Sequence, residues 1–246
     1  MPESLRPHLS VVIPVYNERD NLHPLTAQTL KALSGQVPSF EIIYVDDGST
    51  DGSGLLLDQL ARTHPEIRVL HFDRNYGQTA AFDAGFRHAA GDLIATLDGD
   101  LQFDPQDILK LLPLAERNDL VCGWRRHRHD TLLKRLSSRI ANLVRNAVIH
   151  DGVHDTGCSL KVFRRTVVEK IPFFEGMHRF FPALARMHGF TVAEAPVSHY
   201  PRAHGRSKYG IGNRLFKSLY DLMAVRWMQR RCLRYRYRDS TLNVNR

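Results

Sequence analysis

The chain has 246 residues, of which 43% are hydrophobic and 24% charged, with 12 prolines and 16 glycines. That length can bury the core of one large domain, and the composition excludes a collagen, a coiled coil and a wholly disordered chain. A formal net charge of +8 is compatible with binding to nucleic acid, to an anionic lipid surface or to a phosphorylated substrate. The position of the positive charge along the chain discriminates among these partners.

No apolar run reaches the roughly 18–20 residues that cross a bilayer, and the N-terminus lacks the apolar core of a signal peptide. The three cysteines, Cys122, Cys158 and Cys232, are far apart and form no C-x-x-C pair. A disulfide framework or a zinc knuckle is therefore not expected, and we predict a protein of the reducing cytoplasm.

Residues 9–122 alternate between apolar runs and stretches with helical spacing, which predicts an α/β fold with a mostly parallel sheet. Strands are expected at 9–15, 40–45, 67–72, 92–97 and 119–122, and helices at 19–33, from about 53 to 63, at 78–90 and from Pro105 onward. A long helix over 131–149, a mixed segment over 154–200 and a basic amphipathic helix from Gly210 follow.

Polar and acidic side chains follow three of the predicted strands: residues 16–18, 46–47 and 98–100. Parallel strands place their carboxyl ends at one edge of the sheet, where α/β proteins bind ligands. Asp98 and Asp100, one residue apart on a turn, can both approach a hard divalent cation, and Mg²⁺ or Mn²⁺ with oxygen ligands commonly bridges phosphates. A plain turn is the alternative, but the end of a buried strand favours the functional interpretation.

The run Asp46-Asp47-Gly48-Ser49 has two compatible interpretations. Asp and Ser bond backbone amides in capping turns, so one carboxylate could cap while the other binds ligand. The sequence contains no G-x-G-x-x-G run, no P-loop and no G-x-S-x-G nucleophile elbow, which disfavours a dinucleotide, P-loop or serine-hydrolase site.

Four runs together resemble glycosyltransferase family 2: residues 11–18 (VVIPVYNE), 45–51 (VDDGSTD), 75–77 (NYG) and 98–102 (DGDLQ). Residues 155–158 (DTGC) and 202–209 (RAHGRSKY) are similar to later motifs of its polyprenyl-phosphate branch, which includes dolichol-phosphate mannose synthase and undecaprenyl-phosphate sugar transferases. The resemblance runs in order from Leu9 to Tyr209.

The resemblance implies a GT-A catalytic domain over 9–209, which includes the 131–149 helix, followed by a basic helix and Arg-rich tail over 210–246. It also implies an inverting transfer and assigns the site residues. The nucleoside would be held by Pro14, Tyr16, Glu18 and Asp46. Asp98 and Asp100 would bind the metal, and Gln102 would contact the diphosphate. Arg125 (or Arg126) and Arg202 would meet phosphate charge, and Ser207 and Lys208 would lie on the loop that closes over the donor. Asp100, Arg202 and Asp155 would be the catalytic residues.

The chemistry of the transfer agrees with these assignments. Breaking the anomeric bond leaves a nucleoside diphosphate, so negative charge develops on phosphate, and a metal with Arg donors stabilises it. A lipid phosphate is already an anion and needs cationic groups to position it rather than a strong base. Asp155 would be the base if the acceptor were a hydroxyl, and it could equally be a turn carboxylate that fixes Gly157.

The positive charge gathers in two amphipathic stretches. Seven Lys or Arg residues lie between Arg125 and Arg145 against one acid, Asp130. The second stretch combines an apolar face with a cationic border; the apolar face consists of Leu215, Phe216, Leu219, Leu222, Met223 and Trp227. Such helices suit a membrane interface, where each cation contributes about 1 kcal/mol on an anionic surface. Ordinary core packing gives the same periodicity and stays open.

These features together predict an enzyme that moves a sugar from a UDP- or GDP-linked donor to a polyprenyl phosphate at the cytoplasmic face of the membrane. Relatives in this branch often continue into transmembrane helices, so anchoring here would fall to the interfacial helices or to a separate membrane protein. One alternative is transfer to a sugar or protein hydroxyl. The other is a nucleic-acid-binding protein, which the strand-end carboxylates argue against because they repel phosphate unless a metal intervenes. We expect no nucleic acid as a partner.

Overall fold

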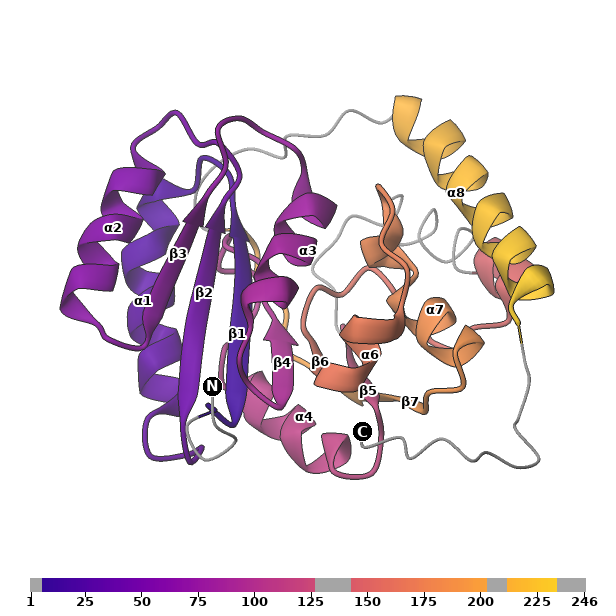
Figure 1. Cartoon of the computed structure of the whole chain (residues 1–246), viewed down its shortest axis with the longest axis horizontal. Helices are drawn as coiled ribbons and strands as arrows, with labels where there is room; N and C mark the ends of the chain where they lie inside the picture. Colours follow the sequence, from indigo (N-terminus) through magenta and orange to yellow (C-terminus); the bar gives the residue numbers. More distant parts are fainter. Residues whose placement is uncertain (1–5, 127–142, 203–211, 234–246) are drawn as a thin grey trace, which may run out of the picture.

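The computed structural model describes residues 6–126, 143–202 and 212–233, with side chains of the last range from residue 219 onward. Seven strands form one sheet in the order β3-β2-β1-β4-β6-β5-β7, and helices cover both of its faces (Figure 1). None of the helices within these ranges combines the length and hydropathy that a bilayer span requires.

The strands are β1 (Leu9–Val15), β2 (Phe40–Asp46), β3 (Ile67–His71), β4 (Leu93–Thr96), β5 (Leu120–Trp124), β6 (Lys161–Arg164) and β7 (Val192–Pro196). The helices are α1 (Arg19–Leu33), α2 (Ser53–Thr63), α3 (Gln78–His88), α4 (Asp107–Ala115), α6 (Arg165–Lys170), the 3₁₀ turn η2 (Met177–Arg179), α7 (Phe181–Met187) and α8 (Gly212–Arg231). Residues 143–149 are also helical.

Strands β1, β2, β3 and β4 are parallel, and β6 runs antiparallel to both β4 and β5. Successive residues of β1 are buried on opposite faces, with Val12 in one core and Val11 and Ile13 in the other. Burial on both faces is the property of a parallel sheet covered by helices on either side. One core holds α1, α2 and α4, and the other holds α3, α6, α7, the 143–149 helix and α8.

The predicted α/β architecture is confirmed, and the observed ends of the five predicted strands lie within two residues of expectation. The antiparallel β6 was not predicted, because its four residues lie inside a segment without a clear hydrophobic period. Of the long helix predicted over 131–149, the part from 143 is observed, and 127–142 lies outside the described residues, as does most of the Arg-rich tail.

The turn after β2 depends on glycine at position 48. Gly48 has a φ of +69°, and a Cβ there would lie 2.3 Å from the backbone carbonyl carbon of Arg74. A backbone atom cannot move away as a flexible side chain can. Gly48 therefore lets the loops after β2 and β3 approach each other beside the strand ends.

We expect Gly48→Ala to destabilise the protein by more than the about 1–3 kcal/mol that a left-handed non-glycine residue costs, because a backbone clash adds to it. Gly35→Ala is the matched control, since Gly35 has a similar φ of +71° but open space around the added Cβ. Chemical denaturation of both variants measures the difference. Equal losses would show that the close approach to Arg74 is unimportant.

Candidate active site

The loops that follow β1 and β2 are joined by hydrogen bonds. The Asn17 amide donates to the Ser49 hydroxyl (2.9 Å), the Thr50 amide donates to the Asn17 side-chain oxygen (2.7 Å), and the Glu18 amide donates to the Ser53 hydroxyl (3.1 Å). Asn17 has a φ of +53°, which Asn tolerates better than most residues. These bonds fix the backbone from which Tyr16 and Glu18 project.

Asp98 and Asp100 follow β4 at the same edge of the sheet. The Asp100 carboxylate is buried, with 6% of the residue exposed, and it accepts a hydrogen bond from the Gln102 amide (3.1 Å). Leu101 has a φ of +59°, so the turn that carries Asp100 is held in an unfavourable backbone conformation. Asp98 is half-buried and accepts a hydrogen bond from the Gln78 side-chain amide of α3 (2.9 Å).

Arg202 joins the carboxylates of two separate loops. One of its guanidinium nitrogens lies 2.7 Å from Asp100 and the other 3.2 Å from Glu18. The segment leading to Arg202 is itself attached to the acidic turn, because Tyr200 donates its amide to the Gln102 carbonyl (2.9 Å) and accepts from the Gln102 side chain (3.3 Å). Arg202 therefore lies at the strand-end site although it is about a hundred residues from Asp100.

The crowding of carboxylates shifts their protonation. Burial raises the pKa of Asp100 to about 6, the negative charge of Asp98 adds to the increase, and Arg202 opposes it. Burial also raises the pKa of Asp98, against the Ser159 hydroxyl and the charges of Lys161, Arg125 and Arg202. A nearby positive charge favours the ionised form of such carboxylates. A divalent metal bound by Asp98 and Asp100 would therefore stabilise their ionised forms.

Lys161 contributes an unexpected cation beneath the site. It lies on β6, is only 2% exposed and donates to the carbonyls of Thr156 and Cys158. A buried ammonium needs such partners. Neither Lys161 nor Gln78 was predicted as a site residue from the sequence. The signal for Lys161 was a lone Lys inside the apolar run Leu160–Phe163.

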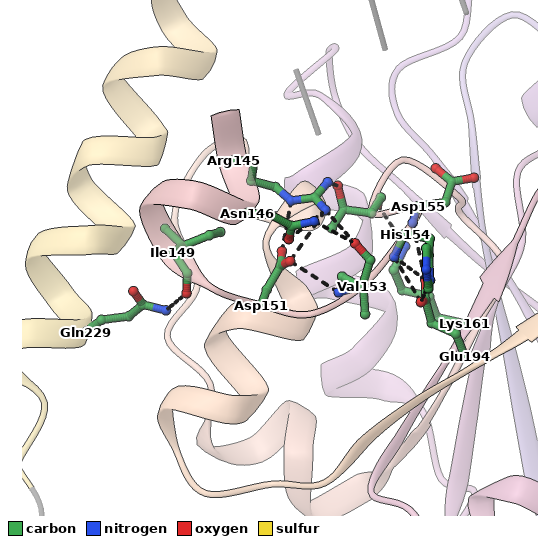
Figure 2. Close-up of polar contacts among 11 residues, drawn as sticks. Arg145, Asn146, Ile149, Asp151, Val153, His154, Asp155, Lys161, Glu194 and Gln229 are labelled. Carbon is green, nitrogen blue, oxygen red and sulfur yellow. Dashed lines mark hydrogen bonds and ion pairs between the residues drawn. The ribbon is translucent and has the colours of Figure 1, made fainter. Parts of the chain in front are cut away.

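Arg125 and Asp155 form a bidentate ion pair, with nitrogen–oxygen distances of 2.7 and 2.9 Å. Asp155 is further held through its backbone amide, which donates to Glu194 of β7 (3.2 Å; Figure 2). Arg126, the alternative phosphate contact, is exposed and lies over the Trp124 ring at 6.0 Å. The geometry thus brings Arg125 rather than Arg126 to the Asp155 loop.

Both carboxylates after β2 have structural hydrogen bonds. Asp46 accepts from the Ser49 amide (3.0 Å) and lies 3.1 Å from a ring nitrogen of His71. Asp47 accepts from the amides of Tyr76 (2.6 Å) and Gly77 (2.9 Å), and burial raises its pKa against these bonds. Asp46 thus caps its own turn and Asp47 binds the loop after β3, while the nucleoside role of Asp46 stays a prediction.

The remaining predicted site residues are distributed as follows. Pro14 is in β1 and Tyr16 directly follows it, both half-buried at the same edge. Ser207 and Lys208 lie within 203–211, outside the described residues. The structure thus brings Glu18, Asp98, Asp100, Gln102 and Arg202 together, and the positive charge of Arg125 lowers the pKa of Asp98 against the effect of burial.

The donor set fits a hard divalent cation that is shared with a substrate. Across 6–126, 143–202 and 212–233, no group of three or more His, Cys, Asp or Glu side chains is arranged to hold a metal ion. Two carboxylates with phosphate oxygens and waters are the usual ligands of Mg²⁺. Asp98 and Asp100 therefore suit a metal that arrives with a diphosphate.

The model of the family named "Glycosyl transferase family 2" matches residues 10–172. The chain belongs to this family. It is 39% identical over 228 residues to a dodecaprenyl-phosphate galacturonate synthase of Rhizobium johnstonii, covering 90% of this chain and 67% of the relative. It is also 39% identical over 218 residues to an undecaprenyl-phosphate 4-deoxy-4-formamido-L-arabinose transferase of Edwardsiella ictaluri, covering 87% and 66%. This chain thus spans about two thirds of the length of these relatives.

Solved structures confirm the GT-A fold. Glucosyl-3-phosphoglycerate synthase of Mycobacterium tuberculosis, crystallised with Mn²⁺, UDP and glucosyl-3-phosphoglycerate, superposes with a TM-score of 0.64 at 18% identity, over 94% of this chain and 81% of that one. A form with Mg²⁺ and UDP gives a TM-score of 0.65 at 19% identity, over 94% and 80%. The predicted identity as a family 2 glycosyltransferase is confirmed.

His71 makes the stability of the glycosyltransferase depend on pH. Desolvation lowers the pKa of His71, but hydrogen bonds and charge from Asp46 and Asp58 outweigh it, so the pKa lies above its ordinary value. The imidazolium is stabilised in the folded state, and its contribution is complete below the unfolded pKa and lost as the pH rises through the folded pKa.

We therefore expect wild type to exceed Asp58→Asn in stability by more at about pH 6 than at about pH 9, where the neutral His71 no longer gains from the Asp58 charge. Urea unfolding at both pH values measures the two differences. Asp83→Asn, which removes the carboxylate of the exposed Arg87 pair on α3, is the control without a titrating histidine. A difference for Asp58→Asn that stays constant or grows with pH would contradict the assignment.

Proposed function

We propose that this glycosyltransferase moves a sugar from a nucleotide-sugar donor to a polyprenyl phosphate, with Mg²⁺ or Mn²⁺ at Asp98 and Asp100. The observation that carries the proposal is the grouping of these carboxylates with Arg202, Arg125 and Lys161 at one edge of the sheet. The names of both sequence relatives specify a polyprenyl phosphate, and structural neighbours were crystallised with UDP and Mn²⁺ or Mg²⁺.

Donor binding would use the carboxylate edge. A bound divalent cation supplies Lewis-acid stabilisation of the diphosphate, and Asp98 and Asp100 would hold it there. Gln78 orients Asp98 through its hydrogen bond. Arg202 pairs with Glu18 and Asp100 and would offset part of the negative charge at this edge, where more negative charge grows as the anomeric bond breaks.

The acceptor side favours an anion over a neutral hydroxyl. A hydroxyl acceptor requires a base, and the candidate base Asp155 forms an ion pair with the Arg125 guanidinium through both of its oxygens. A lipid phosphate needs no deprotonation and is attracted by cations such as Arg125.

A product assay tests the proposal. The full chain is incubated with undecaprenyl phosphate, Mn²⁺ and a panel of UDP- and GDP-linked sugars, and extracted lipid is analysed by mass spectrometry. We expect one donor to yield a lipid-phosphate sugar, and EDTA to abolish it. Sugar found on a glycan or protein hydroxyl instead, or full activity in EDTA, would refute the acceptor or the metal, respectively.

Asp100→Asn and Asp98→Asn should each lower transfer at least about 100-fold, since loss of a transition-state electrostatic contact commonly costs about 2.7–4 kcal/mol. Removing a carboxylate from a crowded acidic group should not destabilise the fold. Asp92→Asn is the control, an exposed acid at the opposite end of β4. Transfer rates, with Mn²⁺ affinity measured calorimetrically in the presence of UDP, check this. Unchanged Mn²⁺ affinity would exclude these residues as ligands.

The outer face of α8 supports peripheral attachment to the cytoplasmic face of a membrane. Leu219, Tyr220, Met223 and Trp227 are 51%, 78%, 57% and 62% exposed. Leu222 was predicted to share this face, but it is 5% exposed and packs inward with Val225. The predicted apolar face therefore combined residues from two different faces of α8. Arg226, Arg230 and Arg231 border the exposed residues, and α8 lies at the outer edge of the molecule beyond α7 (Figure 1). Aromatic and aliphatic residues with a cationic border suit a lipid interface.

Replacing Met223 and Trp227 together by Asp should lower binding to anionic vesicles at least tenfold, because burying each large apolar side chain contributes about 1.5–3 kcal/mol. Leu55→Asp is the control, since Leu55 is 73% exposed on α2, which packs in the other core. Vesicle flotation at low salt measures both. Full-length protein that does not float would instead favour a separate membrane protein as the anchor.

A further inference from the structure

Arg145 is buried although it belongs to a run of basic residues that suggested a membrane surface. Only 7% of the residue is exposed, and its guanidinium lies 3.0 Å from the carboxylate of Asp151, of which 1% is exposed. A buried ion pair is weak evidence of stabilisation, because the desolvation of two charges offsets their attraction. The cluster around Arg145 therefore calls for a role beyond stability.

The backbone that carries Arg145 has a firm base. Ile149, one turn further along the 143–149 helix, is buried in the same core as Leu222 and Val225 of α8. The Gln229 side chain of α8 donates to the Ile149 carbonyl (2.9 Å; Figure 2), which satisfies one of the open carbonyls at the end of the helix. The position of Arg145 is thus set by the core and by α8.

The guanidinium reaches from this base across the loop that leads to the site. It donates to the Val153 carbonyl (2.7 Å) and to the Thr156 hydroxyl, and Asp151 accepts from it at the start of the same loop. Figure 2 shows Arg145 facing Asp151 and Val153. One planar guanidinium therefore fixes three points of residues 151–156, which a lysine could not do with the same geometry.

The loop is held from the opposite side by Glu194 of β7. Its carboxylate accepts from the backbone amides of His154 (2.9 Å) and Asp155 (3.2 Å). Asp155, between these two attachments, forms the bidentate pair with Arg125. Arg145 and Glu194 together thus determine where the Asp155 carboxylate and, through it, the Arg125 guanidinium lie.

We propose that Arg145 is a positioning residue for sugar transfer, which holds residues 151–156 so that the Arg125–Asp155 pair faces the acceptor in the correct place. It touches neither substrate and acts through the loop. The inference rests on the proposed function insofar as Arg125 meets the acceptor. Because the carboxylates that would hold the donor's metal follow β4, outside residues 151–156, loss of Arg145 should affect turnover more than donor affinity.

The test compares Arg145→Met, which keeps most of the side-chain volume, with Arg145→Lys and with the control Arg165→Met. Arg165 also donates to backbone carbonyls, those of Ala89 and Gly91, but away from the loop. We expect Arg145→Met to lower kcat by about 10- to 100-fold with donor KM within about twofold, since small misplacements of catalytic groups cost this much. Arg145→Lys should recover part of kcat, and Arg165→Met should leave it near wild type.

Hydrogen exchange provides the second readout. In Arg145→Met, amides of residues 151–157 should exchange faster while those of β1 and β2 do not change. The proposal needs both results: unchanged kcat, or a lowered kcat with unchanged exchange in 151–157, overturns it. If Arg145→Met does not fold, Asp151→Asn, which weakens the same contact, is held to the same criteria.

These outcomes separate the inference from the function on which it rests. Absence of lipid-linked product with wild type refutes the proposed acceptor by itself. The kinetic comparison is then made on release of nucleoside diphosphate from the donor, and the exchange measurement is unaffected by the choice of acceptor.

Discussion

The carboxylates of Glu18, Asp98 and Asp100 converge where β1 and β4 end, and their mutual repulsion explains the arrangement of the residues around them. Because β1 and β4 are adjacent and parallel, the residues that follow them lie at the same edge of the sheet. Burial and the charge of Asp98 raise the pKa of Asp100 to about 6, so this edge is costly to ionise unless positive charge is near. The cation nearest Asp100, Arg202, comes from a distant part of the chain.

The same need for compensation applies to three largely buried cations of the described residues. Lys161 is surrounded by carbonyls, Arg125 by Asp155, and Arg145 by Asp151 and the loop after it. Each buried cation thus fixes a loop as well as a charge, since its several donors require partners in definite directions. Residues 151–156 connect two of these cations, because Arg145 holds this loop and the loop carries Asp155, the partner of Arg125. In this way the core beneath α8 is linked to the strand-end site.

Sequence reasoning predicted the first half of the fold well because its signals are local. Apolar runs, turn residues and helical spacing place five strands, and the topological rule for parallel sheets then gathers residues 16–18, 46–47 and 98–100. Which cation would meet which acid could not be predicted. The pairing of Arg202 with Glu18 and Asp100 joins residues up to 184 positions apart, and no local pattern encodes such a distance.

The errors in the basic segments have one physical cause. A buried arginine and a surface arginine are indistinguishable by composition, so Arg145 was grouped with membrane-facing charge, and Leu222 was grouped with the exposed face of α8 although it lies in the core. Periodicity identifies an apolar face and does not say what covers it. Gln78 was not predicted for a related reason. Its role depends on the hydrogen bond that its side-chain amide donates to Asp98, and no local sequence pattern indicates that contact.

The central claim is that the paired carboxylates of the acidic turn bind a divalent cation together with a nucleoside diphosphate. Anomalous scattering from crystals grown with Mn²⁺ and UDP tests it most directly. The account predicts one strong Mn²⁺ peak in contact with both Asp98 and Asp100 and with diphosphate oxygens, and no such peak in Asp100→Asn. A Mn²⁺ peak elsewhere, or a bound diphosphate at this edge with Arg202 and without any metal at saturating Mn²⁺, would contradict it.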